Sequence, residues 1–411
     1  MNQYHVWNKW NKLKTVVLGD SYHSEFFGDI KNTKIRSALQ RISDETQEDL
    51  EHYEKVLKDF GCNVIRPHVD SSDNIMNYIN VNNQLKITSV NTVPRGPLQV
   101  RDNQFVAGNK LFAVTDHEKP IIDCLLNYNA HDVIFLNKLE IDDHKTIRHW
   151  DEHKFNSIKG DSWKTFSEYK NNPKYFNELP KNIKQEIMML HEHSSYNYID
   201  APSHTLIGRD LYVDEKNTKL HSYQEKKLLN NISNVRINKL NVGGHNDSCF
   251  SILKPGVILS LNEIQKYNDT FPNWDVCYLP DASFDAIPEF MKLKNQVNGK
   301  WWVPGEEEND EFTHFVETWL QDWVGYVEET VFDVNVLSLD EHHVCVNNLN
   351  NKQINEFLKK HKIEPVHVPW RHRYFYDGGL HCITLDLERE GSQEDYFPER
   401  GNAGVIDHGF D

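Results

Sequence analysis

One order of predicted elements recurs along this chain of 411 residues: two short apolar strands, a helix-like stretch and a third short strand. The two leading strands are typical of hairpins, as in 98–107 and 110–115, which flank the turn residues Gly108 and Asn109. The order appears roughly four times, and a fifth time if the two ends of the chain are combined. No Gly/Ser-rich or Pro-rich linker interrupts it. We therefore predict one toroidal α/β domain over residues 1–411.

The predicted helices carry apolar residues three or four positions apart. One spans 43–60 and is followed by Gly61, a residue typical of the position after a helix. Others are expected at 312–324 and 354–361. Short strands are expected after helices at 62–66, 235–240, 276–279 and 363–368. The segment 141–198 departs from the order because it is polar, aromatic and His-rich, and we predict an insertion there that covers a site.

Charge and hydropathy exclude two classes of partner. The chain has 45 Lys and Arg against 62 Asp and Glu, a net charge of −17, and no basic run. We therefore expect no nucleic-acid binding. No apolar stretch reaches the roughly 18–20 residues of a membrane helix, so we also expect no membrane partner. The acidic balance suits either a cationic substrate or solubility alone.

The six cysteines are scattered along the chain and include no C-x-x-C pair. Neither a zinc knuckle nor a dithiol redox motif is therefore encoded. Most of the cysteines lie in apolar strand-like runs, where a free cysteine packs as a small hydrophobic side chain. We expect reduced thiols, a cytoplasmic location, and neither a metal nor a cofactor.

Four short segments combine titratable side chains with glycines or strand ends, where side chains can reach a ligand. They are 100–103, which contains Asp102, 207–212, which contains Asp210, 241–247, which contains His245 and Asp247, and 377–384, which contains Cys382.

Cys382 is the candidate nucleophile, because it follows two glycines and precedes an apolar strand. A reactive thiolate needs a rigid position and a nearby cation or proton acceptor. His381 is adjacent, but neighbours on a strand point to opposite faces, so we expect a distant histidine as the partner. His245 is the best candidate, although each residue alone is also compatible with a structural role.

The carboxylates allow two interpretations. Asp102 and Asp210 each follow an arginine in an apolar strand, and a buried Asp must be paired or hydrogen-bonded. Each is therefore either part of a local structural ion pair or a receptor for a planar cation, because a carboxylate binds guanidinium in a bidentate fork. Cysteine, histidine and several aspartates on separate strand ends are suited to attack on a guanidinium carbon.

In this order, the four segments resemble the amidinotransferase family of the guanidine-modifying (pentein) superfamily, and most of all the arginine:glycine amidinotransferases. The resemblance runs from residues 6–19 to 378–390 and leaves out the insertion at 141–198. The closing GGLHCITLDLERE is the most specific match, and GRDLY and the H-x-D of GGHNDSCF also agree.

The resemblance implies a five-bladed ββαβ pseudo-symmetric propeller with a site in its central channel. It implies that Cys382 is the nucleophile, His245 the general acid and base, and Asp210 the residue that orients His245. Asp102 and Asp247 would bind the guanidinium of the donor. The implied activity is transfer of the amidino group of L-arginine to an amine such as glycine or a larger amine, through an amidino-cysteine intermediate. The implied partners are thus a small guanidino donor and an amine acceptor, and a homodimer is the assembly that we consider.

Two positions depart from the family. Ile264 stands where glycine-type members carry an arginine that binds the donor carboxylate, and Lys266 is the only cation close to it in sequence. We expect Arg371, in the loop that leads to Cys382, to replace it as a substrate-binding residue, since arginine offers the fork that a carboxylate matches. Residues 242–244 lack large side chains and predict an acceptor bulkier than glycine.

Two alternatives stay open. A hydrolase of the same superfamily, a deiminase or dihydrolase, would share the first half-reaction and admit water instead of an amine. A non-catalytic or metal-binding protein could use His191, His193 and His204, although their spacing lacks the i, i+4 helical pair of common zinc motifs.

Overall fold

The computed structural model of this chain describes residues 2–85, 93–114, 119–136, 164–165, 168, 175, 200–215, 222–242, 244–261, 267–279, 301–325, 329–402 and 404–408. Nearly all of the insertion predicted at 141–198 lies outside these residues, as do Gly243, Ile264 and Lys266. All six predicted site residues lie within them.

The described strands form five separate sheets that share one plan. In one of them, β3 (Gln104–Ala107) and β4 (Lys110–Ala113) pair as an antiparallel hairpin. Helix α3 (Lys119–Asn129) follows, and β5 (Val133–Phe135) then pairs in parallel with β4. The hairpin turns at Gly108, whose φ of +62° is a conformation that glycine adopts without strain.

The other four sheets repeat this plan, with the hairpin, the helix and the parallel strand in that order. The second unit is β6 (His204–Ile207), β7 (Asp210–Asp214), α9 (Ser222–Asn231) and β8 (Arg236–Leu240), and β16 (Gly404–Asp407) is added beside β8. The third is β9 (Phe250–Lys254), β10 (Val257–Ser260), α11 (Tyr267–Thr270) and β11 (Asp275–Tyr278). The fourth is β12 (Leu337–Asp340), β13 (His343–Val346), α15 (Lys352–Lys360) and β14 (Glu364–His367).

The last unit joins the two ends of the chain, as the sequence pattern predicts. Strand β15 (Thr384–Arg389) pairs antiparallel with β1 (Leu13–Leu18), helix α1 (Thr33–Asp59) follows, and β2 (Asn63–Ile65) lies parallel to β1. The predicted α/β class is confirmed. In the part of the chain that the structure describes, no sheet closes on itself.

Helix α1 begins ten positions earlier than the predicted start at residue 43. The Asn32 side chain accepts hydrogen bonds from the backbone N–H groups of Lys34 and Ile35 and caps the helix there. The buried side chains of Ile35 and Leu39 then extend the apolar face by more than two turns. The polar residues between these positions weaken the helical spacing of apolar residues, so the sequence pattern did not predict this part of the helix.

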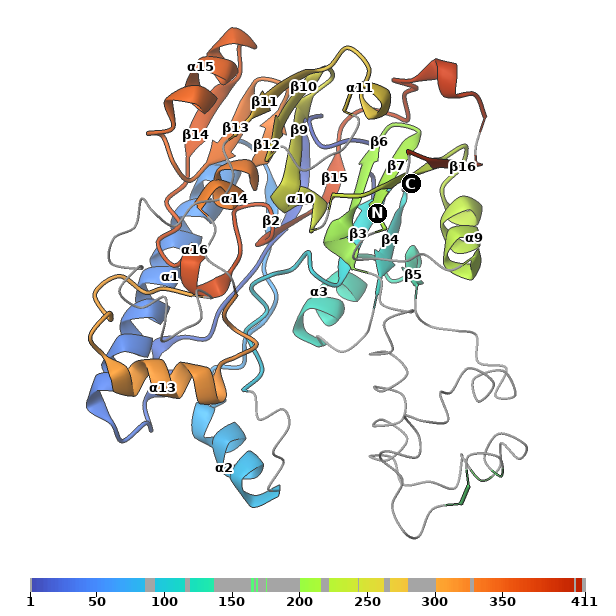
Figure 1. The fold of residues 1–411 in the computed structure, drawn as a ribbon. Coiled ribbons are helices and arrows are strands. Elements are labelled where there is room, and N and C mark those ends of the chain that lie inside the picture. Colours follow the sequence, from blue (N-terminus) through green and yellow to red (C-terminus); the bar gives the residue numbers. More distant parts are fainter. Residues whose placement is uncertain are drawn as a thin grey trace.

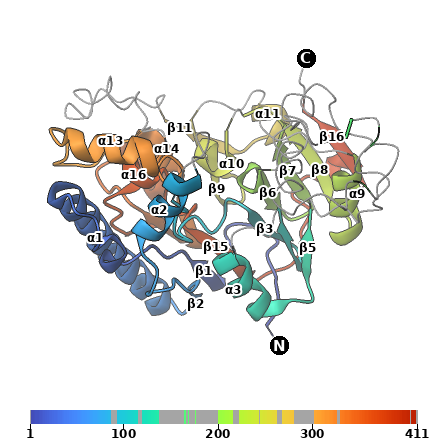
Figure 2. The same ribbon diagram turned by 90° about the horizontal axis from the view of Figure 1, so that it is seen from below.

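Further helices fill the connections between the units. They are α2 (Ile75–Leu85), α10 (Asn246–Cys249), α13 (Asp310–Trp319), α14 (Glu329–Val334), α16 (Arg373–Tyr376), and the single turns η1 (Ser24–Phe27), η3 (Ala201–Ser203) and η4 (Pro398–Arg400). Helices α1, α13 and α16 gather on one side of the molecule and α9 lies on the opposite side (Figures 1 and 2). None of the described helices combines the length and the apolar character needed to cross a membrane.

The apolar side chains form several clusters beneath the helices rather than one central core. The largest packs the inner face of α1 against β1 and α13, with Leu39, Leu57, Val16 and Phe312 fully or nearly fully buried. The second cluster joins β3 and β4 to the unit of β6, β7 and β8, and the third joins β9, β10 and β11 to β13 and α15, so apolar packing holds neighbouring units together. The candidate site lies in loops that precede or follow the strands.

Candidate active site

A cavity of about 130 Å³ brings together three of the predicted site residues, Cys382, His245 and Asp102. They come from the loop before β15, the loop after β8 and the segment before β3. The other described residues that line it are Arg95, Gln99, Ser248, Asp322, Trp323, Val324, Phe332, Tyr376, Asp377, Gly378 and Gly379. Among them are a thiol, an imidazole, carboxylates and an aromatic wall.

Cys382 is held in place by one buried amide side chain. Asn335 Nδ2 lies 3.1 Å from Cys382 Sγ, and Asn335 Oδ1 accepts hydrogen bonds from the backbone N–H groups of His381 (2.9 Å) and Cys382 (3.1 Å). A Cβ added at Gly379 would lie 2.5 Å from Asn335 Oδ1. Glycine is therefore needed here to let Asn335 approach, rather than for an unusual φ angle.

Asp247 lies against the thiol, with its Oδ2 3.7 Å from Cys382 Sγ and 2.7 Å from His381 Nδ1. Burial and the charge of Arg101 lower the pKa of His381 to about 4, so the ring is neutral and its Nδ1–H donates to the carboxylate. Although burial opposes the charge of Asp247, the hydrogen bond from His381, the charge that this ring carries below pH 4, and the charge of His245 hold the pKa of Asp247 at about 2. The other oxygen, Asp247 Oδ1, is buried and accepts no hydrogen bond from any described residue.

The sequence analysis set His381 aside because neighbours on a strand point to opposite faces. This reasoning does not apply, because residues 380–383 form a turn and β15 begins only at Thr384. In the turn, the side chains of His381 and Cys382 both contact Asp247.

His245 carries a proton at neutral pH. Its Nε2 lies 3.1 Å from Asp200 Oδ2, and its side chain is 40% exposed. Burial of the ring opposes the charge, but the hydrogen bond to Asp200 and the negative charges of Asp200, Asp102 and Asp247 outweigh it and raise the pKa to about 10. The imidazolium is thus ready to act as an acid.

Cys382 is a thiol in the free protein. The pKa of the thiol lies well above its ordinary value. Burial is the largest cause of this shift, and the negative charges of Asp247 and Asp102 add to it. A cation placed between these carboxylates would offset their charge and favour the thiolate. A cationic ligand in this cavity would therefore favour the reactive thiolate form of Cys382.

Asp102 does not pair with Arg101, its neighbour in sequence. Its Oδ2 accepts a hydrogen bond at 2.7 Å from Nη2 of Arg95, and Arg95 also donates to Gln99 Oε1. Arg101 instead lies behind Cys382, where its guanidinium binds the backbone oxygens of His381 and Thr384. Both interpretations of Asp102 are therefore compatible with the structure. Asp102 forms a local ion pair, and its position in the cavity also suits recognition of a cation.

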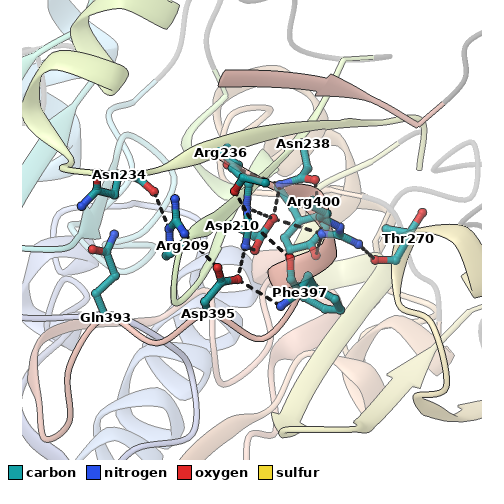
Figure 3. Close-up of polar contacts among 12 residues, drawn as sticks. Arg209, Asp210, Asn234, Arg236, Asn238, Thr270, Gln393, Asp395, Phe397 and Arg400 are labelled. Carbon is teal, nitrogen blue, oxygen red and sulfur yellow. Dashed lines mark hydrogen bonds and ion pairs between the residues drawn. The ribbon is translucent and has the colours of Figure 1, made fainter. Parts of the chain in front are cut away.

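Asp210 does not contact His245, and the predicted orienting contact is corrected in favour of Asp200. Asp210 is fully buried in a network with Arg236, Asn238 and Arg400, at distances of 2.6 to 3.1 Å (Figure 3). The register explains this, since Asp210 pairs with Arg236 at the start of β8, whereas His245 follows the end of β8 at Leu240. Of the two interpretations of Asp210, the structural ion pair is therefore the one that the structure supports.

Arg371 does not line the cavity, contrary to the predicted substrate contact. Its Nε lies 2.9 Å from Asp49 Oδ1 and its Nη2 2.7 Å from Glu48 Oε2, both on α1. Its backbone N–H also donates to Asp49. The side chain ties the loop before Cys382 to α1, and Arg95 is the arginine that lines the cavity.

The sequence analysis missed Asp200, Asn335 and Arg95. Asp200 had a weak signal, because it directly precedes the single turn η3 and the β6–β7 hairpin. Asn335 stands between Val334 and Val336 in an apolar run, where a buried amide needs partners. Arg95 lies in a segment without regular secondary structure and had no signal.

A buried charge cluster supports the turn that carries Cys382. Asp386 pairs with Arg101 and Arg389 at 2.7 Å each, and Lys9 Nζ lies 4.0 Å from it. The three cations around Asp386 hold its pKa well below its ordinary value although burial opposes the charge. Burial lowers the pKa of Lys9 to about 7.

The described residues include no group of three or more His, Cys, Asp or Glu arranged to hold a metal ion. Of the histidines considered for metal binding, His191 and His193 lie outside the described part of the chain. His204 is buried, stacks on Phe105, and its Nδ1 lies 3.0 Å from the backbone oxygen of Asp200.

The fold defined by these sheets is that of solved amidinotransferases. The chain superposes on the amidinotransferase SxtG of Microseira wollei, from the saxitoxin biosynthetic pathway, with a TM-score of 0.55, 16% identity, and coverage of 96% of this chain and 99% of that chain. The values are the same for the inosamine-phosphate amidinotransferase StrB1 of Streptomyces griseus. At this identity, the likeness concerns the fold.

Sequence comparison adds curated relatives. The chain is 39% identical over 158 residues to mitochondrial glycine amidinotransferase of Xenopus laevis, a match that covers 37% of this chain and 28% of that protein. It is 22% identical over 204 residues to L-arginine:L-lysine amidinotransferase of Pseudomonas savastanoi pv. phaseolicola, which covers 48% and 46%. Each match spans less than half of the relative, and no protein-family model matches the chain. These relatives are transferases, and the predicted resemblance to the amidinotransferase family of the pentein superfamily is confirmed.

Proposed function

We propose that this protein is an amidinotransferase that moves the amidino group of L-arginine to an amine through a covalent intermediate on Cys382. The observation that carries the proposal is the buried Oδ1 of Asp247, which has no described hydrogen-bond donor, beside the thiol of Cys382. A buried acceptor without a donor is costly, and a guanidinium N–H would satisfy it. The related amidinotransferases support the same chemistry.

The first half-reaction uses the charges around the cavity. Asp247 and Asp102 bind the donor guanidinium, and its positive charge offsets the two carboxylates that raise the pKa of the thiol. The thiol releases its proton to solvent, because His245 is already protonated, and Sγ forms a bond to the guanidinium carbon. The carbon–nitrogen bond to the amine breaks, and protonated His245 gives its proton to the leaving nitrogen. Ornithine and an amidino-Cys382 adduct result.

The second half-reaction reverses these roles. Neutral His245 takes a proton from an incoming amine, whose nitrogen attacks the amidino carbon. The carbon–sulfur bond breaks, the Cys382 thiolate is restored and the guanidino product leaves. Asp200 keeps the imidazole in place through both steps. The expected kinetics are ping-pong.

The cavity supports an acceptor other than glycine. Trp323, Phe332 and Tyr376 form an aromatic wall that offers apolar contacts to a longer amine. A Cβ added at Gly244 would lie 3.2 Å from Cys249 Sγ, so this glycine also has a packing role beside His245. The same proposal includes a ring of five ββαβ units around the cavity in a single domain, a cytoplasmic location, and a small guanidino donor and an amine as partners.

The test is to isolate the intermediate. Protein is incubated with arginine labelled at the guanidino carbon, without acceptor, quenched in acid and mapped by peptide mass spectrometry. We expect the label on Cys382, no label in Cys382→Ser, and normal labelling in Cys249→Ser, which removes a buried thiol near the site. Ornithine and a guanidino product on addition of an amine identify a transferase. Citrulline or urea, with no dependence on an amine, would contradict transfer and identify the hydrolase.

A further inference from the structure

A guanidinium group of the protein already occupies Asp102. Nη2 of Arg95 lies 2.7 Å from Asp102 Oδ2, and Arg95 also donates to Gln99 Oε1. Gln99 is anchored in turn, since its Nε2 donates to the backbone oxygens of Tyr376 (2.6 Å) and Asp377 (3.0 Å). Arg95 and Asp102 both line the cavity that contains Cys382.

We infer that Arg95 selects the donor by exchange of ion pairs. The donor guanidinium replaces the Arg95 guanidinium on Asp102, and the donor carboxylate replaces Asp102 on Arg95. The donor then forms one ion pair with Asp102 and one with Arg95, in place of the ion pair between Arg95 and Asp102 and of the contacts of the free donor with water. This inference rests on the proposed function, and it adds that Arg95 is the residue that makes the enzyme require a donor with an anionic group.

The chemistry of Asp102 supports the exchange. Asp102 lines the same cavity as His245 and Cys382, and its negative charge acts on both. The fork of a carboxylate binds either guanidinium in the same manner, so Arg95 and the donor compete for one receptor. Release of Arg95 from Asp102 breaks no helix or strand, because residues 93–96 have no regular secondary structure, and the side chain is 30% exposed.

The charges of the cavity explain why the donor carboxylate turns to Arg95. Asp102, Asp322 and Asp377 line the cavity, and a carboxylate that enters it needs a cation. Among the described lining residues, Arg95 bears the permanent positive charge, and His245 is engaged by Asp200. Arg371 is bound to α1 outside the cavity. A donor without a carboxylate, such as agmatine, would displace Arg95 from Asp102. It would offer Arg95 no carboxylate to replace the ion pair that is lost.

The test measures binding apart from chemistry. Arginine and agmatine are titrated by calorimetry into Cys382→Ser, and into the same protein with Arg95→Met, Arg95→Lys or Arg41→Met. Arg41 is the matched control, a half-exposed arginine that pairs with Glu45 and Glu306 outside the cavity. Circular dichroism verifies that each variant is folded.

We expect Arg95→Met to weaken arginine binding by roughly ten- to a hundred-fold, the usual effect of losing a hydrogen bond to a charged group. Agmatine should bind equally well or better, because Asp102 is now vacant. Arg95→Lys should retain part of the preference for arginine, since a point charge lacks the fork. Arg41→Met should change neither affinity.

Three outcomes would overturn the exchange. If arginine and agmatine both bind Arg95→Met more tightly, and by the same factor, Arg95 only blocks the site. Unchanged affinities in Arg95→Met would mean that Arg95 takes no part in donor binding. Failure of arginine to bind Cys382→Ser would also reject it. If arginine binds through Arg95 but no adduct forms on Cys382, the proposed function fails and the exchange stands.

Discussion

The amide of Asn335 binds Cys382 at two points, with Nδ2 3.1 Å from Sγ and Oδ1 accepting a hydrogen bond from the backbone N–H at 3.1 Å. The same Nδ2 lies 3.1 Å from the backbone oxygen of Asp247. One buried side chain therefore sets the position of the thiol relative to the carboxylate that faces it. Asn335 acts through Cys382 and is a positioning residue.

Asn335→Asp should slow alkylation of Cys382 at a given pH. Aspartate keeps the shape and the acceptor of asparagine, but it replaces the N–H donor to sulfur with a negative charge, which raises the thiol pKa further. The measurement is the rate of iodoacetamide labelling of Cys382 against pH. A merely structural role would leave this profile unchanged, and Asn351→Asp, at the cap of α15, is the control.

Asp200→Asn should return the pKa of His245 from about 10 toward its ordinary value of 6.5, because the hydrogen bond and charge of Asp200 raise it. The imidazole protons of His245 can be followed by NMR across this pH range. Asp210→Asn should leave this titration unchanged, since Asp210 lies at the opposite end of the strands. If the pKa of His245 shifts only in Asp210→Asn, Asp210 is the residue that acts on His245, as the sequence analysis predicted.

The sign of the pH effect follows from the raised pKa of His245. Its contribution to stability is fully present below the unfolded pKa of 6.5 and is lost as the pH rises through about 10. The stability of the wild-type protein should therefore fall between these pH values by more than that of Asp200→Asn. Urea unfolding at pH 6 and at pH 10 measures the difference, and equal losses in both proteins would contradict the assignment.

Asp247→Asn should have opposite effects on the thiol and on the donor. Removal of the negative charge lowers the pKa of Cys382, so iodoacetamide should label it faster at neutral pH. Donor binding should weaken, because the variant loses the charge that is proposed to hold the guanidinium. Slower labelling with iodoacetamide would show that the carboxylate does not raise the thiol pKa.

Asp210→Asn should mainly destabilise the fold. The substitution leaves the buried Arg236 and Arg400 without a carboxylate at this position, and the loss of one partner of a buried ion pair costs about 3–5 kcal/mol. Asp275→Asn, which weakens surface pairs with Lys360 and His361, should cost about 0–1 kcal/mol. Urea unfolding gives both values, and an equal effect would argue against the structural role.

Much of the fold was readable from the sequence because hairpins and amphipathic helices are local patterns. The turn at Gly108 and the order of strand, strand, helix and strand depend on residues close in sequence. The start of α1 at Thr33 was missed, because its cap at Asn32 lies before the part of the helix with the clearer apolar spacing. Cys382, His245 and Asp102 were selected by residue type and motif, and all three line the cavity.

The sequence by itself determined which segments carry reactive groups, since glycines, strand ends and titratable residues occur together in it. Only the tertiary structure decided which carboxylate meets which partner. Asp200 precedes η3 and β6, and Asp210 begins β7 ten residues later, after the hairpin turn. The parallel pairing of β7 with β8 brings Asp210 to Arg236. Ion pairs form across space between the nearest charges, so a motif cannot distinguish Asp200 from Asp210, or Arg95 from Arg371, until the strands and loops are packed.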